Sequence, residues 1–195
     1  DYAQHGVTMG NENDIYVARI KIGALLEFTP LEANYGGAIN AIATDDEFVY
    51  VGGTTTRTVR KLSKSDLSQV AVSASYGGDI EAIATDDGFV YVGGWTTRTI
   101  RKLRKSDLSK VAESADYGGN IRAIATDDGF VYVGGDTTQT VRKLRKSDLS
   151  QVAESADYDG IIHAITVDDN YVYVGGSTTQ TVRKLRKSDL SQVAE

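Results

Sequence analysis

The feature that most constrains this chain is an internal repeat with a period of 41 residues. Four tyrosines, Tyr35, Tyr76, Tyr117 and Tyr158, open nearly identical segments at that spacing. The segment that starts at Tyr117 reads YGGNIRAIATDDGFVYVGGDTTQTVRKLRKSDLSQVAESAD. A repeat of this length is one supersecondary unit that cannot bury its apolar faces alone, so neighbouring units must stack. The repeats are therefore 35–75, 76–116, 117–157 and 158–195.

Residues 1–34 are interpreted as a fifth, degenerate repeat. The segment IYV at 15–17 matches VYV at 172–174, and Leu26 precedes Tyr35 by the distance at which Leu67 precedes Tyr76. This copy lacks the GG-x-TT segment of the others. The chain begins and ends at nearly the same phase of the repeat. We therefore expect a single domain over 1–195, in which side-chain packing between the first and fifth units, without strand exchange, closes a ring.

Each repeat carries four short β signals joined by turns. Asp-Asp-Gly, Gly-Gly and Lys-Ser-Asp separate the apolar runs, and these residue types favour tight turns. No stretch shows sustained 3.6-residue periodicity. Connections this short make consecutive strands antiparallel neighbours. In the repeat from Tyr117 the expected strands are 121–126, 130–133, 140–144 and 151–156.

A four-stranded meander of about 40 residues, repeated in tandem, is typical of a β-propeller blade. We predict an all-β fold, a five-bladed β-propeller of four-stranded antiparallel blades. The alternative architecture is a linear β-solenoid, which usually has a shorter period and fewer hairpin turns per unit. The five units are also compatible with being part of a longer array.

The run FVYVGG…TVRKL…SQVAES resembles the YVTN-type repeat and, more loosely, the WD-repeat. In both families an apolar strand, a small-residue turn and a T-V-x-x-hydrophobic strand recur. The resemblance covers residues 35–195. Gly-Gly stands where the YVTN repeat has Thr-Asn, and the Gly-His and Trp-Asp dipeptides of WD-repeats are absent. The resemblance implies a propeller with a binding or structural role and no particular activity.

Composition excludes several classes of function. The 195 residues carry a formal net charge of −6, which argues against partners such as nucleic acids and anionic membranes. No run of 18 apolar residues is present, so we expect no membrane insertion. The chain has no Cys, which rules out disulfides, thiol nucleophiles and cysteine metal sites.

We found no constellation typical of an enzyme, a cofactor site or a metal site. The Asp pairs that recur in every repeat are explained by turn formation, because they lack the alternating ligand spacing of a calcium loop. Acids that repeat identically single out no unlike pair for glycoside hydrolysis. His5 and His163 have no zinc-binding context. The basic runs, such as 101–105, are interpreted as solvated charge on an outer strand that protects a sheet edge.

Comparison of the repeats with one another points to one face of the fold. Three positions carry four different residues, whereas most others are identical. These positions are 38/79/120/161, 40/81/122/163 and 54/95/136/177, and a fourth, 57/98/139/180, is Arg in the first two repeats and Gln in the last two. They fall at the start of the first strand or in the turn between the second and third. In an up-and-down meander these two places share an edge, so we expect all of them on one face.

We predict that this face binds a ligand or partner, since binding residues often lie on loops over a rigid scaffold. Trp95 is the foremost candidate, because an indole at a turn can stack on a sugar ring or anchor a protein. The alternative is that exposed loop positions tolerate drift, with Trp95 packing on a neighbouring blade. The predicted binding residues are Trp95, Asp79, Glu81, Asn120, Arg122, Asp136, Ile161 and His163.

The sequence therefore predicts a non-enzymatic binding module that recognises a glycan or protein surface. The alternative is a structural subunit of a surface layer, virion or extracellular filament, which implies self-assembly. An enzyme ranks third. Both leading hypotheses favour an extracellular or surface-associated location.

Overall fold

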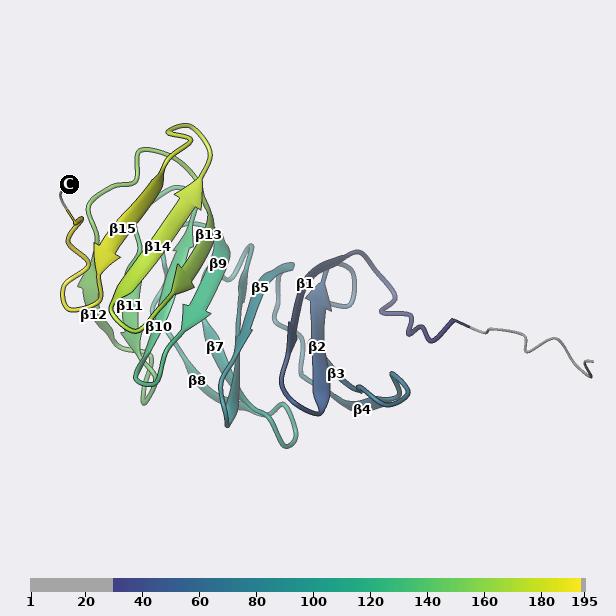
Figure 1. Ribbon diagram of the computed structural model, residues 1–195. Coiled ribbons are helices and arrows are strands. Elements are labelled where there is room, and N and C mark those ends of the chain that lie inside the picture. Colours follow the sequence, from purple (N-terminus) through teal and green to yellow (C-terminus); the bar gives the residue numbers. More distant parts are fainter. Residues whose placement is uncertain (1–29, 194–195) are drawn as a thin grey trace, which may run out of the picture. The chain divides into compact units, whose positions relative to one another are not determined.

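The computed structural model describes residues 30–193, and the residues from Leu31 onward form one compact unit. The predicted degenerate repeat therefore lies almost entirely outside the described residues. Within them the chain forms strands and turns without a helix, which confirms the all-β prediction. Four antiparallel sheets follow one another in chain order, one for each 41-residue repeat from Tyr35 onward (Figure 1).

Each of the first three sheets is a meander of four strands. The first holds β1 (Ile39–Thr44), β2 (Phe48–Gly53), β3 (Arg60–Ser63) and β4 (Gln69–Val72). The second holds β5 (Ile80–Thr85), β6 (Phe89–Gly94), β7 (Arg101–Arg104) and β8 (Lys110–Glu113). The third holds β9 (Ile121–Thr126), β10 (Phe130–Gly135), β11 (Arg142–Arg145) and β12 (Gln151–Glu154).

The last repeat has three strands, β13 (Ile162–Val167), β14 (Tyr171–Gly176) and β15 (Val182–Arg186). Where its fourth strand would begin, Gln192 makes a single bridge to Leu185. Within the described residues the first and last sheets do not contact each other. The described residues thus form four sheets rather than the predicted five. The unit that was expected to form the fifth blade lies in residues 1–34.

In the repeat from Tyr117 the second strand ends at Gly135 rather than at 133, the third covers 142–145 rather than 140–144, and the fourth ends at Glu154 rather than at 156. The first two of these differences have a physical reason. The Gly-Gly pair that was expected to end the second strand continues it, since Gly134 pairs with Ala123 and Gly135 with Ile121. The third strand begins at Arg142 rather than at 140, because Gln139 has a positive φ of 54°. The amide of Val141 then donates to the Ser155 hydroxyl instead of joining the ladder.

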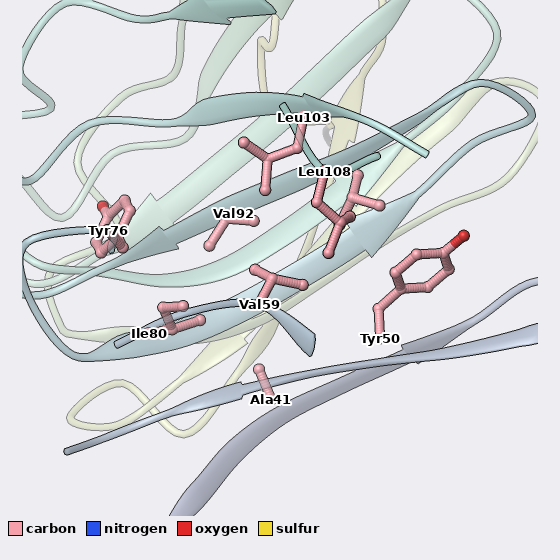
Figure 2. Packing of buried hydrophobic residues seen from close by; sticks show 9 residues of the cluster. Ala41, Tyr50, Val59, Tyr76, Ile80, Val92, Leu103 and Leu108 are labelled. Carbon is pink, nitrogen blue, oxygen red and sulfur yellow. The ribbon is translucent and has the colours of Figure 1, made fainter. Parts of the chain in front are cut away.

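The core lies between the sheets, because every interface joins apolar side chains of two consecutive repeats. At the first interface Ala41, Tyr50 and Val59 of one repeat meet a larger set from the next (Figure 2). This set comprises Tyr76, Ile80, Val90, Val92, Leu103 and Leu108. The same positions, 41 and 82 residues further on, form the other two interfaces. A repeat therefore buries its two faces only against its neighbours.

A glycine in each second strand admits an isoleucine from the next repeat. A Cβ added at Gly93 would lie 2.6 Å from Ile121 Cγ2, and one at Gly134 would lie 2.7 Å from Ile162 Cγ2. These separations are shorter than van der Waals contact, so only glycine fits. Ile121 and Ile162 are fully buried. The Gly-Gly pair is thus a packing feature as well as part of a strand.

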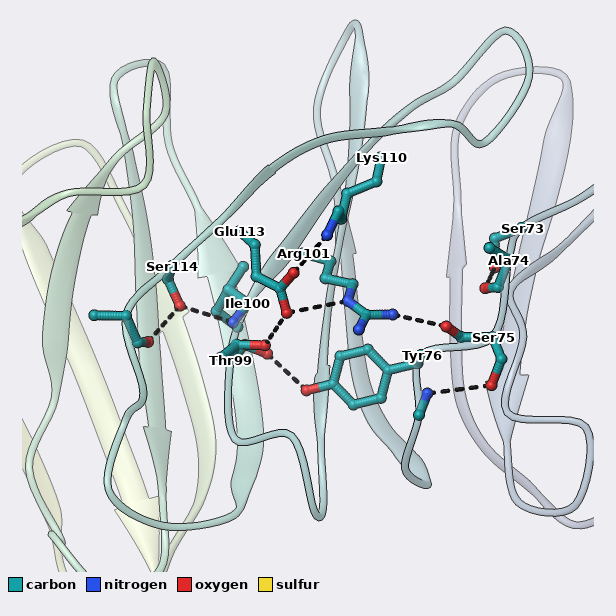
Figure 3. Close-up of polar contacts among 12 residues, drawn as sticks. Ser73, Ala74, Ser75, Tyr76, Thr99, Ile100, Arg101, Lys110, Glu113 and Ser114 are labelled. Carbon is teal, nitrogen blue, oxygen red and sulfur yellow. Dashed lines mark hydrogen bonds and ion pairs between the residues drawn. The ribbon is translucent and has the colours of Figure 1, made fainter.

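Polar groups connect the third strand of a sheet to the loop that precedes the first strand of that sheet. The Tyr76 hydroxyl donates to the Thr99 carbonyl at 2.6 Å, and Arg101 Nη1 donates to the Ser75 carbonyl at 2.7 Å (Figure 3). The Arg101 guanidinium lies 5.0 Å from the centroid of the Tyr76 ring, and its Nε pairs with Glu113. The tyrosine that opens every repeat therefore anchors the start of a sheet.

The basic runs are only in part the solvated charge that the sequence suggested, since Arg104 and Arg145 are exposed. The lysines at the second position, Lys102 and Lys143, and Lys61 at the same position of the first repeat are instead buried at the interfaces between repeats. Lys102 Nζ lies 3.8 Å from the Phe89 ring centroid and donates at 2.6 Å to the carbonyl of Lys146 in the next repeat. Aromatic and carbonyl partners allow a charge to be buried. These lysines join repeats rather than protect an edge.

Candidate functional site

The backbone brings two of the variable positions together in every repeat. The amide of Trp95 donates to the Asp79 carbonyl at 2.9 Å, and the amide of Asp136 donates to the Asn120 carbonyl at 3.1 Å. Thr54 and Ser177 make the same bond to residues 38 and 161. The start of the first strand and the turn after the second strand therefore share one edge of each sheet. We call this edge of the four sheets the variable face.

A strained turn fixes the residue that each repeat presents on the variable face. Trp95 is followed by Thr96 at φ 74°, and the Thr97 amide donates back to the Trp95 carbonyl at 2.9 Å. This is a γ-turn with positive φ, a rare conformation that a β-branched residue adopts only when its surroundings impose it. The other three repeats contain the same turn. The sequence reasoning missed it, although the recurrent Thr-Thr pair marked its position.

Trp95 and three predicted residues of the next repeat, Asn120, Arg122 and Asp136, form one cluster. The Arg122 guanidinium lies 5.3 Å from the Trp95 ring centroid, within the range of a cation–π interaction. The same guanidinium pairs with Asp136 at 3.2 Å. Asn120 donates to Asp136 through its backbone amide at 2.8 Å and through Nδ2 at 3.1 Å. The side chains of Arg122 and Asp136 are thus held in place, while Trp95 remains 39% exposed.

The Asp136 carboxylate stays ionised in this cluster. Its burial alone would raise its pKa, but the hydrogen bonds from Asn120 and the charge of Arg122 outweigh burial and lower the pKa below the ordinary value. An ionised acceptor beside a guanidinium and an indole offers hydrogen bonds and one apolar ring. The cluster can bind a polar ligand that has a flat apolar side.

Asp79 and Glu81 pair with the preceding repeat instead. Arg57 Nε lies 3.1 Å from Asp79 Oδ1, and Asn40 Nδ2 donates to Glu81 Oε1 at 2.7 Å. Arg57 and Asn40 occupy variable positions that the sequence prediction did not include among the binding residues. The sequence did contain a signal for these pairs, because a basic or amide residue at a variable position of one repeat faces an acidic residue at a variable position of the next.

Ile161 and His163 lie on the variable face of the last repeat. Ile161 is half-buried and His163 is exposed. Among residues 30–193 no hydrogen bond or ion pair connects His163 with the Trp95 cluster. The structure therefore brings Trp95, Asn120, Arg122 and Asp136 together and leaves Ile161 and His163 outside this group.

The opposite edge of the sheets carries the Asp pairs, whose first member does more than form a turn. Asp86 Oδ1 accepts the amides of Gly88 and Phe89, which is the predicted turn. Its Oδ2 accepts the Tyr91 hydroxyl at 2.8 Å and pairs with Lys146 of the next repeat at 2.8 Å. Burial acts to raise the pKa of Asp86, and these partners lower it below the ordinary value.

The described residues lack the features of a metal site and of a membrane-spanning helix. Residues 30–193 contain no group of three or more His, Cys, Asp or Glu side chains that could hold a metal ion. The same residues form no helix of the length and apolar character needed to cross a membrane.

Comparisons with known proteins bear on the fold. No protein-family model and no curated protein matches the chain. Among solved structures, it is similar to the computationally designed Ika4 protein, with a TM-score of 0.71 and 17% identity over 80% of this chain and 95% of that one. It is similar to the computationally designed Ika8 protein, with a TM-score of 0.67 and 17% identity over 76% of this chain and 46% of that one.

U3-55K, a WD-repeat propeller, is also similar, with a TM-score of 0.74 and 12% identity over 84% of this chain. The chain spans 53% of the length of U3-55K and, as given above, less than half of Ika8. Identities this low establish the fold alone. Together with the four antiparallel sheets, they show that residues 30–193 adopt a propeller-like repeat fold.

Proposed function

We propose that this protein is a non-enzymatic binding module whose variable face recognises a glycan, with Trp95 as the stacking residue. The single observation that carries the proposal is the half-exposed Trp95 beside Arg122 and Asp136, whose positions are already fixed by hydrogen bonds and an ion pair. An aromatic ring with adjacent polar groups of fixed geometry suits a sugar, which has one apolar side and several hydroxyls.

The surroundings of Trp95 support a glycan over a protein surface. Stable protein interfaces need a broad patch with an apolar centre. The other large apolar side chains that are exposed in residues 30–193 are Leu31, which precedes the first repeat, and residues of the first repeat, of the last repeat or of the outer strands β4, β8 and β12. Trp95 therefore stands alone among polar neighbours, an arrangement that suits a small polar ligand.

The test is Trp95→Ala on a glycan array, with the melting temperature measured in parallel. We expect bound glycans to be lost while the melting temperature stays within about 4 °C, the equivalent of roughly 1 kcal/mol for a domain of this size. Ser177→Ala, the same turn position in the last repeat, is the matched control and should retain binding. Unchanged glycan binding by Trp95→Ala would contradict the proposal.

Two finer predictions accompany this proposal. The first is that residues 1–34 supply a fifth blade and close a five-bladed ring; it is the alternative to the association of two copies that is argued in the next subsection, and the mass of the protein in solution distinguishes the two. The second is the YVTN-type identity of the repeats. The runner-up function, a structural subunit that assembles with itself, is favoured by a separate observation, the exposed Ile39 and Val182 at the two ends of the described repeats.

A further inference from the structure

The two ends of the described array carry the two kinds of face that meet between repeats. Three interfaces join the four repeats, and each is built from a trailing face of one repeat and a leading face of the next. On the leading face of the first repeat Ile39 and Ile42 are exposed, whereas Tyr35, Val51 and Leu62 are buried. On the trailing face of the last repeat Asp168 and Val182 are exposed, and Gly175 and Lys184 are half-buried.

The apolar parts of these two faces are complementary in shape. Ile39 is 45% exposed, whereas Ile80, at the same position one repeat later, is fully buried over Gly52. At the other end Gly175 has no described atom within 4 Å of an added Cβ, and Val182 is 75% exposed. The isoleucine that would fill the space over Gly175 is present on the leading face.

The polar parts of the two faces are complementary as well. Within the array Lys105 pairs with Asp45, Lys146 with Asp86 and Lys187 with Asp127, always from one repeat to the preceding one. The fourth pair of this series would join Lys64 of the leading face to Asp168 of the trailing face, and both residues are exposed. Lys184 occupies the position from which Lys143 donates to a carbonyl of the next repeat.

We propose that the leading face of one copy of this protein binds the trailing face of a second copy. The contact repeats the interface that already joins the four repeats, with Ile39 over Gly175 and Lys64 paired with Asp168. Such a contact uses different surfaces on the two partners, so it propagates into a ring where the rotation closes and into a filament where it does not.

Two candidates could cover the leading and trailing faces, a second copy of the protein or residues 1–34. The sequence of residues 1–34 favours the second copy. When IYV at 15–17 is matched with VYV at 172–174, Ala18 stands where the other repeats have a glycine that admits isoleucine. Counted back from the next tyrosine, Gly23 stands where Lys64 stands. The segment therefore lacks the glycine that would receive Ile39 and the lysine that would pair with Asp168, whereas a second copy supplies both.

The test blocks one face at a time. Ile39→Arg places a charge on the leading face and Val182→Arg places one on the trailing face, so each variant should be unable to use that face for association. Because both side chains are exposed, far-UV circular dichroism should show that the variants fold. By sedimentation equilibrium each blocked variant alone should be a monomer, the mixture of the two should reach twice the monomer mass and no more, and the unblocked protein should exceed the monomer mass. Val111→Arg, at a matched 42% exposure on β8, should associate like the unblocked protein.

Three results would overturn the proposal: an unblocked protein that stays monomeric up to millimolar concentration, blocked variants that do not combine, or Val111→Arg that dissociates equally. A charge exchange gives a second test. Lys64→Glu and Asp168→Lys should each weaken association about fivefold, as expected for one partly exposed ion pair, and the double variant should restore it. Association should be unchanged in Trp95→Ala, so failure here is distinguishable from failure of the glycan proposal.

Discussion

The glycine that admits isoleucine between repeats yields a matched pair of substitutions, Gly134→Ala and Gly175→Ala. The two glycines follow the same VYV segment in consecutive repeats, and neither has a positive φ. A Cβ at Gly134 would lie 2.7 Å from Ile162 Cγ2 and 2.8 Å from Ile165 Cδ1. A Cβ at Gly175 meets no described atom within 4 Å. The pair therefore separates crowding from every other effect of the substitution.

The expected magnitude follows from two opposing terms. Excess volume in a well-packed core costs about 1–3 kcal/mol, and the Cγ2 of a buried β-branched residue cannot rotate away freely. Alanine also restricts the unfolded chain, which stabilises by about 0.4–1 kcal/mol. Gly134→Ala should thus lose about 1–2 kcal/mol, or roughly 2–8 °C in melting temperature. Gly175→Ala should keep or slightly raise the melting temperature.

The assay is thermal unfolding followed by circular dichroism at a protein concentration low enough to keep the chain monomeric. That condition matters because association would also fill the space over Gly175. Gly52→Ala, which would crowd Ile80 Cγ2 at 2.6 Å, should reproduce the effect of Gly134→Ala. Equal shifts for Gly134→Ala and Gly175→Ala, or none for the former, would refute the packing that we assign to the interfaces.

Two further predictions concern the buried charges between repeats. Lys102→Met should destabilise by about 1–3 kcal/mol, because it leaves the Lys146 carbonyl without its donor, whereas Lys184→Met, at the uncovered end, should cost less than half as much in the same urea titration. Stability should also fall at both extremes of pH. Asp86 has a lowered pKa in the folded state, so its contribution is present above the unfolded value of about 4 and is lost as pH falls through the folded pKa. Burial and then the bond to Asp86 raise the pKa of Tyr91, so its contribution is present below about pH 10 and is lost above it. Asp86→Asn should flatten the acid side of a stability–pH curve, and an unaltered curve would contradict this assignment.

The repeat architecture could be predicted because it depends on periodicity. The 41-residue spacing and the turn residues predicted one antiparallel sheet per repeat, and the four described sheets confirm it. Strand ends could not be predicted as well. Gly134 and Gly135 have the composition of a turn, but Gly134 lies against Ile162 of the next repeat and Gly135 lies against the Asn120 carbonyl of its own sheet. Only a packed neighbour reveals that role.

The burial of Lys102 could not be predicted for a related reason. A run such as Arg-Lys-Leu-Arg-Lys looks solvated when it is considered alone. The ammonium of Lys102, its second residue, is buried because the Phe89 ring of the same sheet and a carbonyl of the next repeat both lie next to it. Neither partner is adjacent in sequence, and the constancy of this lysine among the repeats was the available signal.

The eight predicted binding residues now separate into groups with different physical roles. Asp79 and Glu81 already have partners in Arg57 and Asn40 of the preceding repeat, so a ligand would have to compete with these pairs. A residue that only stabilises the contact between repeats is expected to be buried, as the lysines and isoleucines at the interfaces are. Trp95 contacts Arg122 of the next repeat and yet keeps 39% of its surface exposed, on a strained turn that fixes its position. The proposed recognition therefore depends on Trp95 and the two side chains that flank it, rather than on the variable face as a whole.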